Sequence, residues 1–217
     1  MFLLHRHIGV SDLLIKQDLR KLLSIIMVAT LLQSSCTDTK SAKRNQFVDN
    51  RDQQVYEVIP IGAQDWLGVD LKFQTPASFC YDNEEENCRE YGRLYYYHEA
   101  KTACPEGWRL PTEMDWRTVE QALGMEPAEV EVIRVWRGDQ EGALLAQKLG
   151  LKFSGMGKSR GTDFLGKDQF VYYWVDAPGP AGEQFSLYRM FSKRESQIYS
   201  DQVPKMDLCC VRCVRGG

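Results

Sequence analysis

Among the residues of this 217-residue chain, the cysteines could take part in the most kinds of chemistry. One of its seven cysteines, Cys36, follows an apolar N-terminal stretch. The other six are Cys80, Cys88, Cys104, Cys209, Cys210 and Cys213. Cys209 and Cys210 are adjacent, so they could act as a redox pair or hold a soft metal such as copper. The plainer interpretation is one buried and one exposed free thiol, or a disulfide between the two.

Histidine is scarce, which limits the catalysis that these thiols could support. Only His98 remains once the first 35 residues are removed. A catalytic thiolate needs a nearby cation or imidazole to lower its pKa, and nothing in the spacing places His98 beside Cys209 or Cys210. Most histidine-based zinc sites are excluded as well. We therefore expect no catalytic residue, no metal site and no cofactor.

The first 36 residues have the order of an export signal. Residues 22–32 are apolar and uncharged, and eleven residues are too few to span a bilayer but suit a signal peptide. The stretch before them is basic, with Arg6, Lys16, Arg20 and Lys21. It runs into Ser34, Ser35 and Cys36, which resembles a bacterial lipoprotein signal with lipid attached to the Cys36 thiol, although Gln33 stands where the usual pattern has leucine. The alternative is an ordinary secretory signal followed by an incidental cysteine.

We expect three regions: a lipoprotein signal peptide over residues 1–35, a flexible polar tether over 36–54, and one domain over 55–217. Without residues 1–35 the chain has 23 Lys and Arg against 28 Asp and Glu, a net charge of −5. Strong nucleic-acid binding needs a clustered basic surface, so nucleic acid is not an expected partner. An even number of cysteines in an exported chain favours disulfides, but six cysteines allow fifteen pairings and spacing alone does not choose one.

The elements around the cysteines are mostly helical first and mostly strands later. We expect strands over 55–61 and 66–73 around a turn at 62–65, a solvated polar loop over 80–93, and loops around the glycines of 155–166. Helices are expected over 96–103, 112–124, 127–137 and 141–149, and further strands over 170–175, 185–191 and 208–214. Thr112 is the expected N-cap of the second helix, with Asp115 at the capping-box position, and Met114 is expected at the edge of its buried face. This order, without alternating βαβ units, predicts an α+β fold with an antiparallel sheet.

Aromatic residues offer a second kind of site, since their rings can stack on sugars. Tyr172 and Trp174 alternate with Tyr173 along one expected strand, so they should face opposite sides of the sheet. We expect Tyr172 and Trp174 in the core. Tyr173, with Tyr188 and Arg189, is the candidate ligand-binding surface.

Several short blocks, taken together in order, carry a family resemblance. They are Ile61-Gly62, Trp66-Leu67, Asp70-Leu71, Cys80-Tyr81-Asp82-Asn83, Asn87-Cys88, Tyr91-Gly92-Arg93-Leu94-Tyr95, Cys104-Pro105-x-Gly107-Trp108-x-Leu110-Pro111 and Val211-Arg212-Cys213-Val214-Arg215. The series resembles the Fibrobacter succinogenes major paralogous domain (FISUMP). The resemblance implies an exported, often lipid-anchored protein whose fold is similar to C-type lectin-like domains, with helices on a small antiparallel sheet. Residues 108–112 are also similar to a segment of formylglycine-generating-enzyme-like domains, which share that broad fold.

The resemblance also implies two disulfides, Cys80–Cys88 and Cys104–Cys213. Cys209 and Cys210 depart from the family pattern. Formylglycine-generating enzymes use paired cysteines for oxygen chemistry, so a thiol- or copper-dependent oxidase using Cys209, Cys210 or Cys213 is one alternative. Motifs of calcium-dependent sugar-binding lectins are absent from the sequence, and we expect no sugar binding of that kind.

We expect a non-catalytic, lipid-anchored protein of a Gram-negative cell envelope. Its place would be the outer membrane, on the cell surface or the periplasmic face. Its role would be adhesion, glycan capture or membership of an envelope complex, with the membrane, a glycan or an envelope protein as partner. Besides the oxidase-like enzyme, a subunit of secretion or gliding machinery is the other alternative.

Overall fold

The structure is a computed structural model that describes residues 45–158 and 163–217. The expected signal peptide, Cys36 and the first part of the expected tether, residues 36–44, therefore lie outside the described residues. In the part that the structure describes, no helix is both long enough and apolar enough to cross a membrane. The fold is mixed α+β, as the sequence predicts.

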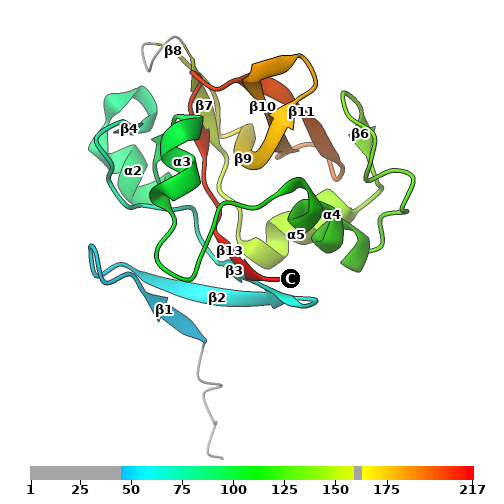
Figure 1. Ribbon diagram of the computed structural model, residues 1–217, viewed down its shortest axis with the longest axis horizontal. Helices are drawn as coiled ribbons and strands as arrows, with labels where there is room; N and C mark the ends of the chain where they lie inside the picture. Colours follow the sequence, from blue (N-terminus) through cyan, green and yellow to red (C-terminus); the bar gives the residue numbers. More distant parts are fainter. Residues whose placement is uncertain (1–44, 159–162) are drawn as a thin grey trace, which may run out of the picture. The chain divides into compact units, whose positions relative to one another are not determined.

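A small sheet joins the two ends of the described chain. Its strands, in spatial order, are β1 (Gln46–Val48), β2 (Val55–Ile61), β3 (Gln64–Leu67) and β13 (Val214–Gly216), and they lie together in Figure 1. The turn between β2 and β3 is shorter than predicted, because Gly62 has a φ of 62° and pairing resumes at Gln64. The strand predicted to run to residue 73 ends at Leu67.

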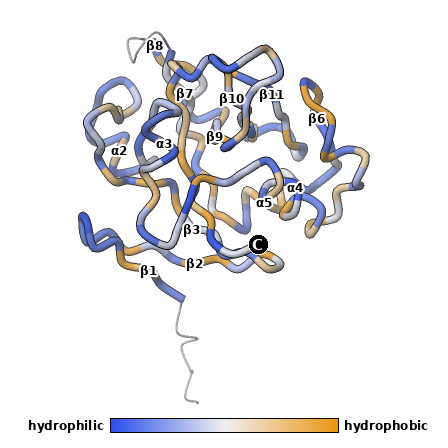
Figure 2. The backbone as a smooth tube through the Cα atoms, viewed as in Figure 1, coloured by the Kyte–Doolittle hydropathy of each residue, from blue (hydrophilic) through white to orange (hydrophobic). Residues whose placement is uncertain are grey.

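β1 corrects the predicted boundary of the tether. Phe47 of this strand lies opposite Tyr56 of β2, and its ring lies 5.4 Å from that of Trp108. The turn between β1 and β2 is hydrophilic (Figure 2). The strand has only three residues and follows a polar segment, so the sequence did not predict it. Its packing against Trp108 depends on the folded protein.

The main sheet is larger than predicted, and it is mixed rather than purely antiparallel. Its path runs β4 (Ser78–Phe79), β5 (Leu94–Tyr95), β12 (Cys209–Cys210), β9 (Phe170–Gly179), β10 (Gly182–Ser192), β11 (Ile198–Pro204) and β6 (Trp136–Arg137). A hairpin of β7 (Ser154–Lys158) and β8 (Asp163–Lys167) is attached through β7 to β9. β9 pairs in parallel with β12 and β7, and the other described pairs are antiparallel.

Glycines conceal β7 in the sequence, where we predicted loops. Gly155 has a φ of 73°, and a Cβ there would lie 2.5 Å from the carbonyl oxygen of Leu165. A Cβ on Gly157 would lie 2.8 Å from a side-chain carbon of Leu208. Glycine inside a strand marks a close approach of other chain segments, and here it lets β8 and Leu208 pack directly on β7.

The described helices are η1 (Tyr81–Asn83), α2 (Glu85–Tyr91), α3 (Tyr97–Ala103), α4 (Glu113–Ala122) and α5 (Glu141–Leu149). α4 begins where predicted, because Thr112 and Asp115 form both hydrogen bonds of a capping box. α5 has the predicted bounds and ends at Gly150, which has a φ of 58°. Met114, expected near a buried face, is instead 66% exposed.

Two segments differ from the prediction. Residues 80–93 contain η1 and α2, and the sequence signal for α2 was Glu85 and Glu86 in the first turn, Arg89 in the last turn and Gly92 as the stop. Residues 127–137 do not form the predicted helix but turns that end in β6. Pairing of β6 with β11 replaces helical hydrogen bonding there.

The core occupies both faces of the main sheet. One cluster contains Tyr173 and Cys210, and the other contains Trp174 and Cys209. The side chains alternate along β9 and β12 as they do in any strand. Both faces are covered, so both members of each alternating pair are buried. α4 and α5 contribute buried side chains to the cluster that contains Tyr173, and α3 contributes to the cluster that contains Trp174.

Candidate functional site

The four cysteines that belong to the family blocks form two disulfides. Cys80 pairs with Cys88, and Cys104 pairs with Cys213. These are the two pairs that the family resemblance implies. The first closes a loop across η1 and α2, and the second joins the end of α3 to the residue before β13.

Cys209 and Cys210 are free thiols, and both are fully buried. The expectation that one would be exposed is wrong, because each face of the main sheet carries a core cluster. Burial raises the pKa of both thiols well above the usual value. Nearby negative charge raises these pKa values further, from Asp207 for Cys209 and from Asp70 for Cys210. The Cys210 sulfur lies 2.8 Å from the hydroxyl oxygen of Ser154. A buried thiol with a raised pKa is a poor nucleophile and a poor metal ligand.

His98 does not join these thiols. Its side chain is 66% exposed, its Nε2 lies 3.5 Å from Glu99, and its ring stacks on Tyr96 at 5.9 Å. No hydrogen bond links it to either free cysteine among the described residues. The described part of the chain therefore contains no assembled cysteine–histidine pair.

The predicted ligand-binding surface of Tyr173, Tyr188 and Arg189 is not a surface. Tyr173 and Arg189 are 0% exposed and Tyr188 is 9% exposed. The prediction assumed one solvated face of the sheet, but the face of Tyr173 is covered by the cluster around Trp116. Tyr172 and Trp174 are in the core, as predicted.

A different region contains two pockets that share Lys72 in their lining. We call this region the Lys72 cleft. A small pocket of about 60 Å³ is lined by Val69, Asp70, Lys72, Glu90, Tyr91, Gly150, Lys152 and Arg212. A wider pocket of about 390 Å³ is lined by Asp52, Gln54, Lys72, Gln74, Glu85, Cys88, Arg89 and Arg93. Most of these side chains are polar or charged.

Backbone hydrogen bonds outside regular strands hold the wall that carries Asp70 and Lys72. The amide of Leu71 donates to the carbonyl of Val211 at 2.9 Å, and the amide of Arg93 donates to the carbonyl of Leu71 at 3.0 Å. Gly92 ends α2 with a φ of 88°, and a Cβ there would lie 2.8 Å from that of Asp70. The segment after β3 is therefore irregular but closely packed.

The inner end of the small pocket is a buried polar network. Arg212 lies 2.5 Å from Asp70, and the Tyr173 hydroxyl donates to Asp70 Oδ1 at 2.8 Å. Arg212 Nη1 also donates to the carbonyls of Leu67 and Leu149, at 3.0 and 3.2 Å. Burial raises the pKa of the Asp70 carboxyl, against the opposing charge of Arg212 and the hydrogen bond from Tyr173. Among the described buried atoms, Asp70 Oδ2 and Arg212 Nε have no hydrogen-bond partner.

The outer rim of the cleft is rich in cations. Lys72 Nζ donates to the backbone carbonyl of Arg89 at 2.7 Å, and Lys152 Nζ lies 3.9 Å from Glu90. Burial and the nearby charge of Lys152 lower the pKa of Lys72, which Asp70 partly offsets. Arg93 lies 3.3 Å from Glu85 in a pair that is largely exposed on the glutamate side.

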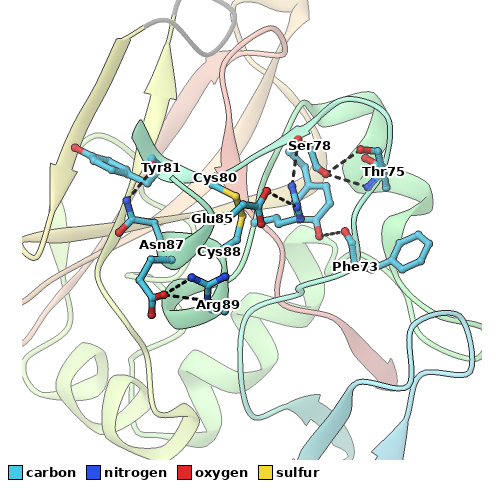
Figure 3. The surroundings of a disulfide bond; sticks show 12 residues. Phe73, Thr75, Ser78, Cys80, Tyr81, Glu85, Asn87, Cys88 and Arg89 are labelled. Atoms are coloured by element: carbon cyan, nitrogen blue, oxygen red, sulfur yellow. Dashed lines mark hydrogen bonds and ion pairs between the residues drawn. A yellow bond between two sulfur atoms is a disulfide. The ribbon is translucent and has the colours of Figure 1, made fainter. Parts of the chain in front are cut away.

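The disulfide beside the wider pocket excludes one further site. Cys80, Glu85 and Cys88 place their ligand atoms within 4.8 Å of one another, and Figure 3 shows the Glu85 side chain beside the bonded sulfurs. Both sulfurs are used in the disulfide, so only one carboxylate remains. This group does not form a metal site in the oxidised protein.

Little in the sequence indicated the cleft, whose residues come from five separate segments of the chain. Asp70 and Arg212 stand in the family blocks, but nothing near either residue indicated that they pair across 142 positions of the chain. Lys72 and Lys152 are ordinary surface lysines by sequence. Only the folded protein brings these four residues to one place.

The comparisons with known proteins give one match. Neither a curated protein nor a solved structure matches the chain. A family model, the Fibrobacter succinogenes major domain, matches residues 43–215. The match covers most of the chain, includes β1, and contains both disulfides, the Asp70–Arg212 pair and the lining of the Lys72 cleft. This chain belongs to the Fibrobacter succinogenes major domain family.

Proposed function

We propose that this chain is a lipid-anchored protein of a Gram-negative cell envelope whose domain acts by binding and does not catalyse a reaction. The lipid is carried by Cys36, and the domain adopts a C-type-lectin-like fold at the outer membrane. Its partner is an envelope glycan or an envelope protein, and the Lys72 cleft is its binding site.

The burial of the free thiols is the observation that carries the non-catalytic part of the proposal. An oxidase using Cys209 or Cys210 needs a sulfur that oxygen, copper or substrate can reach as a thiolate. Both sulfurs are enclosed by core residues, and their pKa values are raised by burial. His98, exposed at the surface, does not supply an imidazole to them.

The disulfides support an exported location. Two disulfides in one domain persist in oxidising compartments and are rare in the cytosol. The lipoprotein-like order of residues 22–36 agrees with export and adds the anchor.

The connection of the chain ends supports the lectin-like fold. Cys104, at the end of α3, is tied to Cys213 in the last segment of the chain, and β13 pairs with β3. Lectin-like domains also tie a helix to a terminal strand.

The anchor is tested with protein taken from membranes of the cells that produce it. Cys36→Ser should move the protein from the membrane fraction to the soluble fraction, and Ser41→Ala, in the same polar segment, should leave it membrane-bound. Mass spectrometry should find a lipid on the Cys36 peptide of the unchanged protein. A Cys36→Ser protein that stays in the membrane would exclude the anchor.

The non-catalytic role is tested by counting reactive thiols in the same mature protein. We expect no reaction of Cys209 and Cys210 with an aromatic disulfide reagent in native protein, and reaction of both after unfolding. Rapid reaction of either thiol in native protein, or copper bound in proportion to the protein, would favour the oxidase alternative instead.

A further inference from the structure

We propose that the Lys72 cleft binds a saccharide that carries a carboxylate, with the carboxylate at the small pocket and the sugar body in the wider one. This inference rests on the binding role proposed above and specifies its ligand class.

The charge at the rim favours an anion. Lys72 has a backbone carbonyl as its hydrogen-bond partner, and no ion pair of Lys72 occurs among the described residues. Lys152 is 49% exposed, and its nearest carboxylate oxygen, on Glu90, lies at the 3.9 Å edge of ion-pair contact. The two lysines are close enough that the positive charge of Lys152 helps to lower the pKa of Lys72. An anionic group between them removes this repulsion and forms charge-assisted hydrogen bonds.

The inner end of the small pocket contains one hydrogen-bond donor, on Arg212, and one acceptor, on Asp70, that have no partner among the described residues. Arg212 and Asp70 are 1% and 3% exposed, and Arg212 Nε and Asp70 Oδ2 lack partners. Buried polar atoms without partners are uncommon, and they indicate a bound water or a ligand. Both atoms are closed to a water-sized molecule, so a hydroxylated carboxylate offers an acceptor to Arg212 Nε and a hydroxyl donor to Asp70 Oδ2 only once these side chains have shifted.

The negative side chains in the wall favour a carboxylate over a phosphate. Asp70 and Glu90 line the same small pocket as Lys72, Lys152 and Arg212. A phosphate monoester carries a charge of about −1.5 to −2 at neutral pH, and its repulsion from these two carboxylates grows with that charge. The volume of about 60 Å³ also suits one planar carboxylate or a few waters rather than a whole ligand.

The wider pocket has the size and chemistry for the sugar body. Its volume of about 390 Å³ lies within the range of about 300–1,000 Å³ that is usual for small-molecule sites. Gln54, Gln74 and Arg93 line it and offer amide and guanidinium groups to hydroxyls. Lys72 lines both pockets, so a ligand that contacts Lys72 from the small pocket is placed next to the wider one.

The test is calorimetric titration of the intact mature protein with three probes: a galacturonic acid trisaccharide, the neutral galactose trisaccharide, and galactose 6-phosphate. We expect the acidic trisaccharide to bind at least about tenfold more tightly than the other two, since hydrogen bonds to charged groups contribute most of the difference. Raising the salt concentration should weaken this binding.

Matched variants locate the site. Lys152→Gln and Lys72→Gln should each weaken binding of the acidic trisaccharide by about tenfold. Lys148→Gln, which changes an exposed lysine of α5 outside the cleft, should leave it unchanged. Thermal unfolding of each variant shows that the fold is retained.

Equal binding of the acidic and neutral trisaccharides, tighter binding of the phosphate, no binding of any probe, or an equal effect of Lys148→Gln would each overturn this inference. None of these results bears on the anchor or the unreactive thiols, which are measured separately. A failure of the ligand class is therefore distinguishable from a failure of the proposed function.

Discussion

At the scale of single residues, this fold depends on arginines buried with carboxylates. Arg189 is 0% exposed and contacts Glu120 at 2.7 Å, Glu113 at 2.9 Å and Ser200 at 2.7 Å. Arg137 shares Glu120 at 3.1 Å. Burial, with the nearby charge of Arg189, lowers the pKa of Arg137 to about 10, despite the two glutamates. These contacts join α4 to β10 and β6, and they explain why Arg189 is no part of a binding surface.

Removal of Arg189 should therefore destabilise the protein strongly. Arg189→Leu leaves Glu120 buried without its main partner, and breaking a buried pair in this way costs about 3–5 kcal/mol. Arg194→Leu, at an exposed position in the following turn, should change stability by less than about 0.5 kcal/mol. Urea unfolding of both variants measures the difference. Similar losses in the two would show that the buried network contributes little.

At the scale of elements, side-chain hydrogen bonds decide where α4 starts and connect this helix to the small sheet. Asp115 accepts hydrogen bonds from the amide and hydroxyl of Thr112, at 2.7 and 2.6 Å, and also contacts Arg109. Gln64 of β3 donates to the same carboxylate at 2.8 Å. The N-terminus of α4 is thereby connected to the small sheet, which a capping box alone would not achieve.

The capping box should show this double role. Thr112→Ala should cost about 1 kcal/mol, the usual loss for an N-cap. Asp115→Ala should cost more, about 2–3 kcal/mol, because it also leaves Arg109 and Gln64 without this carboxylate. Thr118→Ala, on the exposed side of the same helix, is the control and should be nearly neutral. Thermal unfolding of the three variants ranks them, and an Asp115 loss no larger than that of Thr112 would contradict the connection.

The two disulfides should differ in their contribution to stability. Cys104–Cys213 closes a separation of 109 residues and Cys80–Cys88 one of 8. In the chain-entropy model these loops contribute about 4.7 and about 2.5 kcal/mol. We expect Cys104→Ala with Cys213→Ala to lower the free energy of unfolding by more than Cys80→Ala with Cys88→Ala does. Denaturant titration of both double variants checks the order, and the reverse order would show that local strain outweighs loop entropy.

At the scale of the whole molecule, the carboxylates predict how stability depends on pH. Burial by itself would raise the pKa of Glu113, but the charge and hydrogen bonds of Arg189 and Arg117 outweigh it and hold the pKa below its usual value. The pKa of Asp115 is lowered in the same way, against burial, by Arg109 and Thr112. Asp49 has a lowered pKa as well, because its bonds to Arg51 outweigh burial. Asp70 acts in the opposite direction, since burial raises its pKa.

Acid should therefore weaken the fold. A carboxyl whose folded pKa is lowered stabilises the protein above its unfolded pKa, and this stabilisation is lost as the pH falls through the folded pKa. We expect the free energy of unfolding to fall below about pH 4.5, the unfolded value for glutamate. In Glu113→Gln the fall should be shallower, whereas the surface variant Glu183→Gln should behave like the unchanged protein. Urea unfolding at pH 7 and pH 3 compares the slopes, and an unchanged slope in Glu113→Gln would be the contrary result.

Much of the local structure could be predicted because its causes are local. β2, α3, α4, α5, β9 and β10 were found within a few residues from periodicity, caps and β-branched or aromatic runs. The predicted helix over 127–137 failed because Arg137 is drawn into contact with Glu120 and β6 pairs with β11. The sequence did not predict β7 and β11, because both contain glycines or polar residues that do not favour a strand. Their pairing with neighbouring strands forms them in the folded protein.

The family, the α+β class and most helix ends could be predicted from the amino-acid sequence, because they depend on residue types at short spacing or on motifs in a fixed order. The two disulfide pairs followed from the family resemblance. Which side chains are accessible to solvent depends instead on how the elements pack. Tyr173, Arg189, Cys209 and Cys210 could each have faced solvent on a half-covered sheet, but core clusters cover both faces. The Lys72 cleft likewise exists only after folding, because Asp70 and Arg212 meet across nearly the whole domain.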